Sequence, residues 1–225
     1  MRYYPINLDI QGRKCLVVGG GPVATRKVGT LLSCGAGVTV VSPEASGEIR
    51  QLAAAGSVRW RPRPYESSDL GGMFLVIGAT DNEELNLQIH TDAERRGKLC
   101  NIADQPKASN FIVPSIVNRG DLIVAISTSG KSPAFSKKLR RDLESYFGDE
   151  YAVFLRLMGA IRSKLLRAKH EPEVHKPLFE LLIEGGLLEM IREENKDAVD
   201  ALLLRILGKG YEFEKLMGQE TTTAV

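Results

Sequence analysis

The sequence has no long hydrophobic run, since no segment approaches the roughly 18 consecutive apolar residues of a membrane-spanning helix. Its opening stretch, MRYYPINLDIQG, also lacks the apolar core of a signal peptide. The 225 residues are 43% hydrophobic and 26% charged, a composition typical of globular proteins that fold in water. We therefore expect a cytoplasmic protein without a membrane partner, long enough for one large domain or two smaller ones.

The sequence also has few cysteines and histidines and a small net charge. Three cysteines (Cys15, Cys34 and Cys100) are an odd number without metal-ligand spacing, so we expect reduced, structural thiols. The three histidines are not spaced as zinc ligands on one helix face, and no metal site is expected. A net charge of +2 is too small to indicate a nucleic-acid partner. The absence of a G-x-S-x-G or Walker lysine pattern argues against a serine hydrolase of that type and a P-loop NTPase.

The most informative stretch is KCLVVGGGPVA, at residues 14–24. Its apolar residues 15–18 are rich in β-branched side chains and too few for a helix, which predicts a buried parallel strand. Gly19, Gly21 and Ala24 then match the G-x-G-x-x-G/A spacing, in which a tight turn brings the start of a helix close to a pyrophosphate. Such glycines also occur in ordinary turns, so the interpretation depends on the strands and helices around this turn.

Strands and helices alternate from residue 14 to residue 102. The predicted strands are 15–18, 38–41, 58–61, 73–77 and 98–102, and the predicted helices are 22–34, 46–55 and 82–96. This alternation predicts an α/β fold with a Rossmann-like, doubly wound parallel sheet, which we assign to an NAD-binding domain at residues 1–112. Because the glycine turn lies between a strand and a helix of this unit, we favour a dinucleotide-binding turn over an ordinary one.

The sequence changes character after residue 102. Two β-rich runs, 111–117 and 122–127, flank residues 118–121, which predicts an antiparallel hairpin with a four-residue loop. The hairpin has more apolar surface than a lone ribbon can bury, so we expect it to hold two chains together. The predicted parts are a dimerisation region at 113–147, a helical domain at 148–218 and a disordered tail at 219–225.

Ligands of open parallel sheets bind outside the carboxyl ends of the strands, at the switch point. We therefore expect one cleft formed by segments 19–23, 42–44, 78–81 and 101–104. Glu44 is the acid nearest the end of the second strand, where a carboxylate binds the ribose 2′-hydroxyl of NAD. No lysine or arginine stands there to neutralise a 2′-phosphate, which favours NAD while leaving NADP open.

Two further acids have alternative interpretations. Asp81, with Asn82, either contributes to the cleft or caps the helix after it. Asp104 follows the fifth predicted strand, where a carboxylate beside a bound nicotinamide could transfer a proton. It could equally be a turn former ahead of Pro106. Position along the chain does not decide between the two.

Four motifs, found in order, resemble the dehydrogenase module of siroheme synthase, the precorrin-2 dehydrogenase family. They are GGGPVATRKVGTLLSCGA, IGATDNEELN, CNIADQPKASNFIVPSI and IAISTSGKSPAFSKKLR. The resemblance covers roughly residues 2–150 and implies NAD-dependent oxidation of precorrin-2 to sirohydrochlorin. In bifunctional members it also implies Fe²⁺ insertion to give siroheme. It implies a homodimer, and because no methyltransferase module is present, another protein is expected to supply precorrin-2.

The resemblance also assigns site residues. Pro22, Val23, Pro43 and Glu44 match cofactor-contacting positions, and Asp104 matches the catalytic aspartate. With the turn and strand ends, the candidate cofactor-binding residues are Gly19, Gly20, Gly21, Pro22, Val23, Ser42, Pro43, Glu44 and Thr80.

A basic cluster comes after the hairpin, and its candidate substrate-binding residues are Lys131, Lys137, Lys138 and Arg141. They would steer a polycarboxylate such as precorrin-2, or they form an ordinary solvated face.

Three functions of the chain stay open: the dehydrogenase, a dehydrogenase with added chelatase activity, and a catalytically silent NAD-sensing module.

Overall fold

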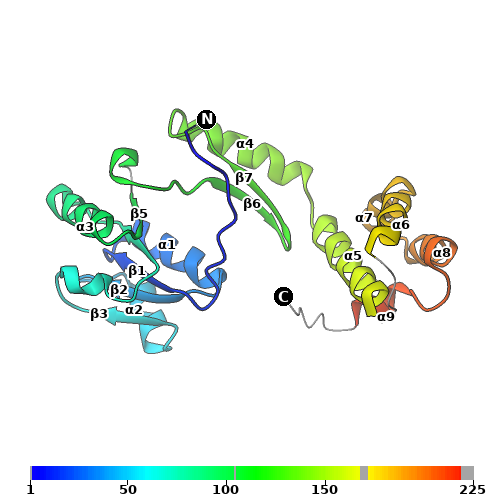
Figure 1. Ribbon diagram of the computed structural model, residues 1–225, viewed down its shortest axis with the longest axis horizontal. Coiled ribbons are helices and arrows are strands. Elements are labelled where there is room, and N and C mark those ends of the chain that lie inside the picture. The colour runs from blue at the N-terminus through cyan, green and yellow to red at the C-terminus, as the bar shows by residue number, and fades with distance from the viewer. Residues whose placement is uncertain (1, 104, 168–171, 219–225) are drawn as a thin grey trace. The chain divides into compact units, whose positions relative to one another are not determined.

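The computed structural model describes residues 2–103, 105–167 and 172–218. Asp104 and the tail expected at 219–225 lie outside the described residues. The chain divides into two compact units, Met1–Val113 and Pro114–Val225, whose helices and strands are labelled in Figure 1. The finer division into a hairpin region and a separate helical domain stays a prediction.

The first unit is built around five parallel strands. Its elements are β1 (Lys14–Val18), α1 (Pro22–Ser33), β2 (Gly37–Val41), α2 (Gly47–Ala54), β3 (Val58–Arg61), the 3₁₀ helix η1 (Ser67–Leu70), β4 (Leu75–Gly78), α3 (Glu83–Arg95), β5 (Leu99–Ile102) and the 3₁₀ helix η2 (Pro106–Ala108). The strands lie in the order β3-β2-β1-β4-β5, so the chain leaves β1 first towards one side of the sheet and later towards the other. This order confirms the predicted Rossmann-like, doubly wound sheet.

The carboxyl ends of the central strands are level with one another. Val18, at the end of β1, pairs with Val41 at the end of β2 and with Gly78 at the end of β4. Val41 also pairs with Arg61, the last residue of β3. The loops after these strands therefore begin at one edge of the sheet, which is where the sequence predicts a cleft.

Alternate side chains of β1 enter two separate cores. Cys15 and Val17 pack in the core that includes residues of α1 and α2, whereas Leu16 and Val18 pack in the core that includes residues of α3 and η1. All four side chains are buried, with exposures of 2% or less. Because β1 is covered on both faces, its run of apolar residues is unbroken rather than alternating.

The second unit begins with an antiparallel hairpin and continues as helices. Its elements are β6 (Ser115–Arg119), β7 (Leu122–Ile126), α4 (Pro133–Tyr146), α5 (Glu150–Arg167), α6 (Pro172–Glu184), α7 (Leu187–Arg192), α8 (Lys196–Leu207) and α9 (Phe213–Met217). Arg119 ties the hairpin to the end of α4, because its Nε and Nη2 donate to the carbonyl oxygens of Phe147 at 2.7 Å and Glu144 at 2.8 Å. Buried side chains from α5 to α9 form a third core.

The hairpin differs from its predicted form. Its first strand begins at Ser115 rather than at residue 111, because the Phe111 carbonyl accepts a hydrogen bond from Asn101 Nδ2 at 3.1 Å beside β5. Arg119 pairs directly with Leu122, so the loop has two residues and not four. Gly120 takes a φ of 63° at the first loop position, where a two-residue type II′ turn requires glycine.

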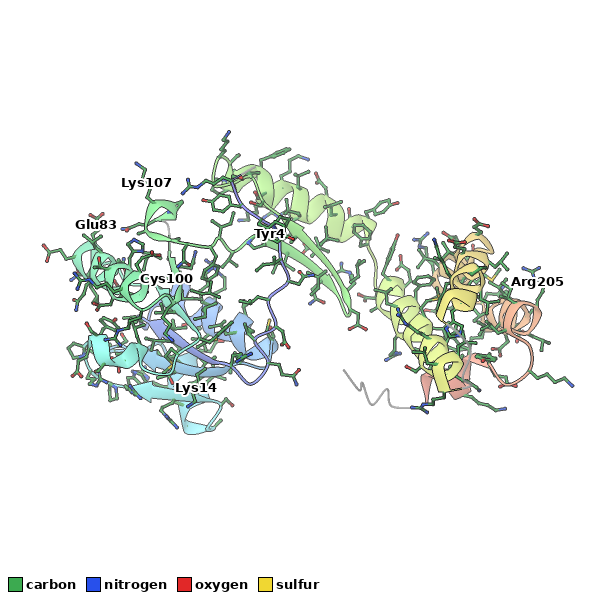
Figure 2. All side chains as sticks on the ribbon, viewed as in Figure 1. Tyr4, Lys14, Glu83, Cys100, Lys107 and Arg205 are labelled. Atoms are coloured by element: carbon green, nitrogen blue, oxygen red, sulfur yellow. The ribbon has the colours of Figure 1, made fainter. Side chains whose placement is uncertain are left out.

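The cysteines are free thiols, as expected, with Cys15 and Cys100 buried and Cys34 exposed. Burial raises the pKa of Cys15 to about 11 and that of Cys100, labelled on β5 in Figure 2, to about 12. Both thiols are therefore protonated at neutral pH, which fits a packing role. Within the described ranges, none of the helices has the length and apolar character needed to cross a membrane.

Candidate dinucleotide-binding site

The glycine turn after β1 packs directly against two neighbouring loops. Gly19 has a φ of 121°, and a Cβ there would lie 2.2 Å from the carbonyl oxygen of Ala79 in the β4–α3 loop. A Cβ at Gly20 would lie 2.0 Å from the carbonyl oxygen of Glu44 in the β2–α2 loop. The Gly20 carbonyl accepts a hydrogen bond from Ser46 N–H at 2.8 Å. Residues without a side chain at positions 19 and 20 therefore allow the three loops to meet.

Gly21 has a different environment, because a Cβ there would meet no protein atom within 4 Å. It caps α1, and Pro22 follows at the start of the helix. Pro22 has no N–H and Thr25 N–H donates to the Gly21 carbonyl at 3.0 Å, so the N–H groups of Val23 and Ala24 have no partner within the helix. Free N–H groups at a helix start attract anions. The open space and these donors together fit the pyrophosphate of a dinucleotide.

These loops surround a cavity of about 810 Å³ at the carboxyl edge of the sheet. Its volume is within the range of small-molecule sites. The cavity is lined by every residue predicted to bind the cofactor, namely Gly19, Gly20, Gly21, Pro22, Val23, Ser42, Pro43, Glu44 and Thr80. Ala103 after β5 lines it too, so all four segments expected to converge contribute to one cavity.

The β4–α3 loop is held by a buried amide. The Thr80 hydroxyl donates to Asn86 Oδ1 at 2.9 Å, and Asn86 Nδ2 donates back to the Thr80 carbonyl at 2.9 Å. Asn82 caps α3 by accepting a hydrogen bond from Leu85 N–H at 2.9 Å. The helix-cap interpretation therefore applies to Asn82, whereas the exposed Asp81 lines the cavity. The Thr80 hydroxyl is therefore already hydrogen-bonded within the protein, and it stabilises the conformation of the loop.

Several residues of the site were missed by sequence reasoning. Asn86 shares the buried face of α3 with Ile89 and Ala93, so a polar residue at an inward position was the available signal. Pro64 and Tyr65 also line the cavity. No sequence signal marks them, because they reach the cavity only through the pairing of β3 beside β2.

The end of β2 carries the candidate ribose-binding acid. The Ser42 carbonyl accepts a hydrogen bond from Trp60 Nε1 at 3.1 Å, which holds this end of β2 to β3. Glu44 is exposed, and within the part of the chain that the structure describes it forms no ion pair. An unpaired carboxylate here suits the hydroxyl groups of a ribose and repels a phosphate.

Asp104, the predicted catalytic residue, lies outside the described residues, but the segment after it is tied to β5. Asn110 Oδ1 accepts from Cys100 N–H at 2.9 Å, and Asn110 N–H donates to the Cys100 carbonyl at 3.0 Å. Ser109 Oγ accepts from Ile102 N–H at 2.9 Å. These bonds satisfy the outer edge of β5 in place of another strand.

The predicted substrate-binding residues Lys131, Lys137, Lys138 and Arg141 belong to the second unit and are exposed. Lys138 Nζ lies 2.6 Å from Asp142 Oδ2. The other three have no ion-pair partner among the residues that the structure describes. The described residues contain no group of three or more metal-ligating side chains.

Two family models match the chain. One, described as putative NAD(P)-binding, covers residues 6–115, and the other, described as sirohaem biosynthesis protein central, covers residues 119–146. The cavity residues thus fall in a nicotinamide-cofactor domain, and the predicted basic cluster falls within the second match.

Known proteins resemble the chain along most of its length. Siroheme synthase of Methylococcus capsulatus is 36% identical over 91% of this chain and 43% of the relative, and that of Thioalkalivibrio sulfidiphilus is 35% identical over 97% of this chain and 45% of the relative. The chain therefore spans less than half the length of these relatives. The solved structure of SirC, a precorrin-2 dehydrogenase, has a TM-score of 0.75 and 29% identity, covering 91% of this chain and 99% of SirC. The chain belongs to the family of siroheme-biosynthesis proteins that includes precorrin-2 dehydrogenase and the corresponding module of siroheme synthase.

Proposed function

We propose that this chain is an NAD⁺-dependent dehydrogenase that oxidises precorrin-2 to sirohydrochlorin. The observation that carries the proposal is the convergence of the nine cofactor candidates on one cavity at the switch point of the sheet. The substrate assignment rests on the likeness to SirC, which extends over 99% of that precorrin-2 dehydrogenase.

NAD⁺ is proposed rather than NADP⁺ because of the charge at the end of β2. Glu44 lines the cavity there with a carboxylate that no described residue pairs. A carboxylate accepts hydrogen bonds from the ribose hydroxyls of NAD⁺ and repels the 2′-phosphate of NADP⁺.

The chain's own residues would bind and orient both reactants. The N–H groups of Val23 and Ala24 hold the pyrophosphate at the start of α1, and Glu44 holds the ribose. When bound, the nicotinamide supplies a hydride acceptor. Asp104 takes a proton from the substrate as a general base. Lys131, Lys137, Lys138 and Arg141 attract the carboxylates of the tetrapyrrole.

A second activity, insertion of Fe²⁺ into sirohydrochlorin to give siroheme, is proposed only as an addition. Metal insertion must displace two pyrrole protons, and one carboxylate beside the macrocycle would assist this step and the oxidation alike. The alternative function is a catalytically silent module that senses NAD⁺ through the same cavity.

Turnover of precorrin-2 tests these functions on the purified protein. We expect NAD⁺-dependent formation of sirohydrochlorin, and the Asp104→Asn variant, which keeps the side-chain size, should be roughly 10²- to 10⁴-fold slower with unchanged NAD⁺ affinity. Wild-type protein that binds NAD⁺ without turnover would be the silent module. An Asn variant with wild-type rates across a pH series would make Asp104 a turn residue. Siroheme formation from Fe²⁺ and sirohydrochlorin without NAD⁺ separates the added chelatase from the dehydrogenase alone.

A further inference from the structure

A charged cluster lies in the segment that connects β3 to η1. Asp69 is buried, with 1% of its side chain exposed, and it accepts hydrogen bonds from two guanidinium groups. Arg61 Nη1 lies 2.5 Å from Oδ1, while Arg63 Nη2 and Nη1 lie 2.6 Å from Oδ1 and 2.9 Å from Oδ2. Glu66 adds a second carboxylate, 3.9 Å from Arg63 Nη1. Two positive and two negative side chains therefore balance each other.

The cluster adjoins the end of the cavity where the ribose of the cofactor is proposed to bind. Arg61 pairs with Val41 across the sheet, and its carbonyl accepts a hydrogen bond from Ser42 N–H at 3.3 Å. Arg63 immediately precedes Pro64, a cavity-lining residue, and its Nη1 donates to the Pro64 carbonyl at 2.8 Å. No arginine directly follows β2 in the sequence. The neighbouring strand β3, however, places Arg61 beside the end of β2.

The same cavity wall has a second anchor, in which a carboxylate binds two hydroxyl groups. Asp92 Oδ2, on α3, accepts hydrogen bonds from the Tyr65 hydroxyl at 3.2 Å and from the Ser67 hydroxyl at 2.5 Å. Asp69 and Asp92 therefore both hold this segment in place, but among the described residues only Asp69 of these two forms ion pairs with arginines. A substitution of Asp92 should loosen this cavity wall without freeing Arg61 or Arg63. Comparing it with a substitution of Asp69 therefore distinguishes an effect of charge from an effect of wall rigidity.

We propose that Asp69 is a specificity-determining residue, which disfavours NADP⁺ by engaging the guanidinium groups of Arg61 and Arg63 beside the ribose end of the cavity. Each arginine side chain is about one-third exposed, at 34% and 35%, so each is near solvent yet its charge is already matched. A 2′-phosphate would need such charge-assisted donors and would also meet the carboxylate of Glu44. This inference rests on the proposed function of the cavity as an NAD⁺ site.

The test is calorimetric titration of the 225-residue chain with NAD⁺ and with NADP⁺, in the absence of substrate. Asp69→Asn removes one negative charge and keeps the side-chain shape, so the affinity for NADP⁺ relative to NAD⁺ should rise about ten-fold. Adding Arg63→Gln to Asp69→Asn removes a freed donor and should reverse most of this gain. Asp92→Asn is the matched control, and it should leave the affinity ratio unchanged.

An unchanged ratio in folded Asp69→Asn protein, or an equal shift in Asp92→Asn, would overturn the inference. If Asp69→Asn does not fold, Glu66→Gln provides the test. Because Glu66 is 63% exposed, loss of its charge should raise the affinity for NADP⁺ relative to NAD⁺ by a smaller factor. No change in this affinity ratio would reject the inference. Wild-type protein that binds both dinucleotides equally would overturn the selectivity alone. Wild-type protein that binds neither would reject the proposed function as well.

Discussion

At the residue scale, Gly20 and Gly21 are neighbours with different roles. A Cβ at Gly20 would lie 2.0 Å from the Glu44 backbone oxygen, whereas a Cβ at Gly21 would meet no protein atom within 4 Å. Gly21 also has a φ of −82°, which any residue can adopt. Position 20 therefore needs glycine for the fold, whereas position 21 faces open space in the cavity and tolerates a side chain.

This difference predicts opposite outcomes for two substitutions. Gly21→Asp places a negative side chain at the start of α1, so NAD⁺ affinity should fall on the order of 100-fold or more while the melting temperature changes little. Gly20→Ala should instead destabilise the fold by about 3 kcal/mol through overpacking against the Glu44 backbone. Titration calorimetry and thermal unfolding measure the two effects. Unchanged NAD⁺ binding by Gly21→Asp would move the cofactor site elsewhere.

Asp69 predicts a pH dependence of stability. Burial alone would raise the pKa of Asp69, but hydrogen bonds from Arg63, the Glu66 backbone and Arg61 outweigh it and hold the pKa below its usual value. A lowered pKa means that the folded state favours the carboxylate. The contribution of Asp69 to the free energy of unfolding is therefore fully present above its pKa in the unfolded chain, about 4. It is lost as the pH falls through the lower pKa of the folded state.

Wild-type protein should consequently exceed Asp69→Asn in free energy of unfolding by about 2 kcal/mol at neutral pH, because a charge-assisted network is lost. The difference should begin to shrink below about pH 4. Urea unfolding of both proteins at a series of pH values from about 7 to about 3 measures it. A difference that stays constant over this range would mean that the carboxylate charge of Asp69 does not stabilise the fold.

At the scale of the element, the β6–β7 hairpin has one exposed face that is mostly apolar. Val117 is buried, but Ile116 on the opposite face is 37% exposed and Ile123 is 52% exposed. Ile116 pairs with Ala125, and Asn118 pairs with Ile123, so these four side chains share that face. A two-stranded ribbon with an open apolar face is marginal in water. We propose that the matching face of a second copy covers it.

Ile123→Lys should therefore weaken the proposed homodimer, because it would bury an unpaired charge in the interface. Sedimentation velocity at micromolar concentration should find dimeric wild-type protein and largely monomeric Ile123→Lys. Leu204→Lys is the matched control, since Leu204 is 55% exposed on α8 and lies outside the hairpin. It should leave the dimer intact. Monomeric wild-type protein would reject the proposed interface.

At the scale of the whole molecule, the two compact units do not share a hydrophobic core among the described residues. Among the described residues, the two cores on either side of the parallel sheet contain side chains of Met1–Val113, and the helical core contains side chains of Pro114–Val225. All the described residues that line the candidate cofactor cavity belong to the first unit. Folding and dinucleotide binding of the first unit should therefore not require the second.

A fragment comprising residues 1–113 should accordingly unfold cooperatively and bind NAD⁺ with an affinity within about three-fold of that of the 225-residue chain. Circular dichroism during heating and calorimetric titration test the two expectations separately. The same fragment should not oxidise precorrin-2, because it lacks the proposed substrate-binding residues Lys131, Lys137, Lys138 and Arg141. A fragment that folds but binds NAD⁺ far more weakly would assign part of the cofactor site to the second unit.

Local sequence determined the glycine turn, the sheet type and the convergence of the cavity loops. The strand, turn and helix of residues 14–33 follow one another along the chain, so their identity depends on neighbouring residues. In a parallel sheet the loops after the strands emerge at one edge, which is why strand ends such as Ser42 and Thr80 are recognisable as cavity residues from the sequence.

Other features, namely the cavity residues after β3 and the start of the hairpin, were decided only by the tertiary structure. Pro64 and Tyr65 reach the cavity, and Arg61 reaches the end of β2, because β3 pairs beside β2. The hairpin begins at Ser115 because the Phe111 backbone is bonded to Asn101 on β5. In each case the deciding contact joins segments that are separate in sequence, and neither periodicity nor spacing encodes which partner a strand or a carbonyl will find. The charges of Arg61 and Arg63 are present in the sequence, but their neutralisation by Asp69 exists only in the folded protein.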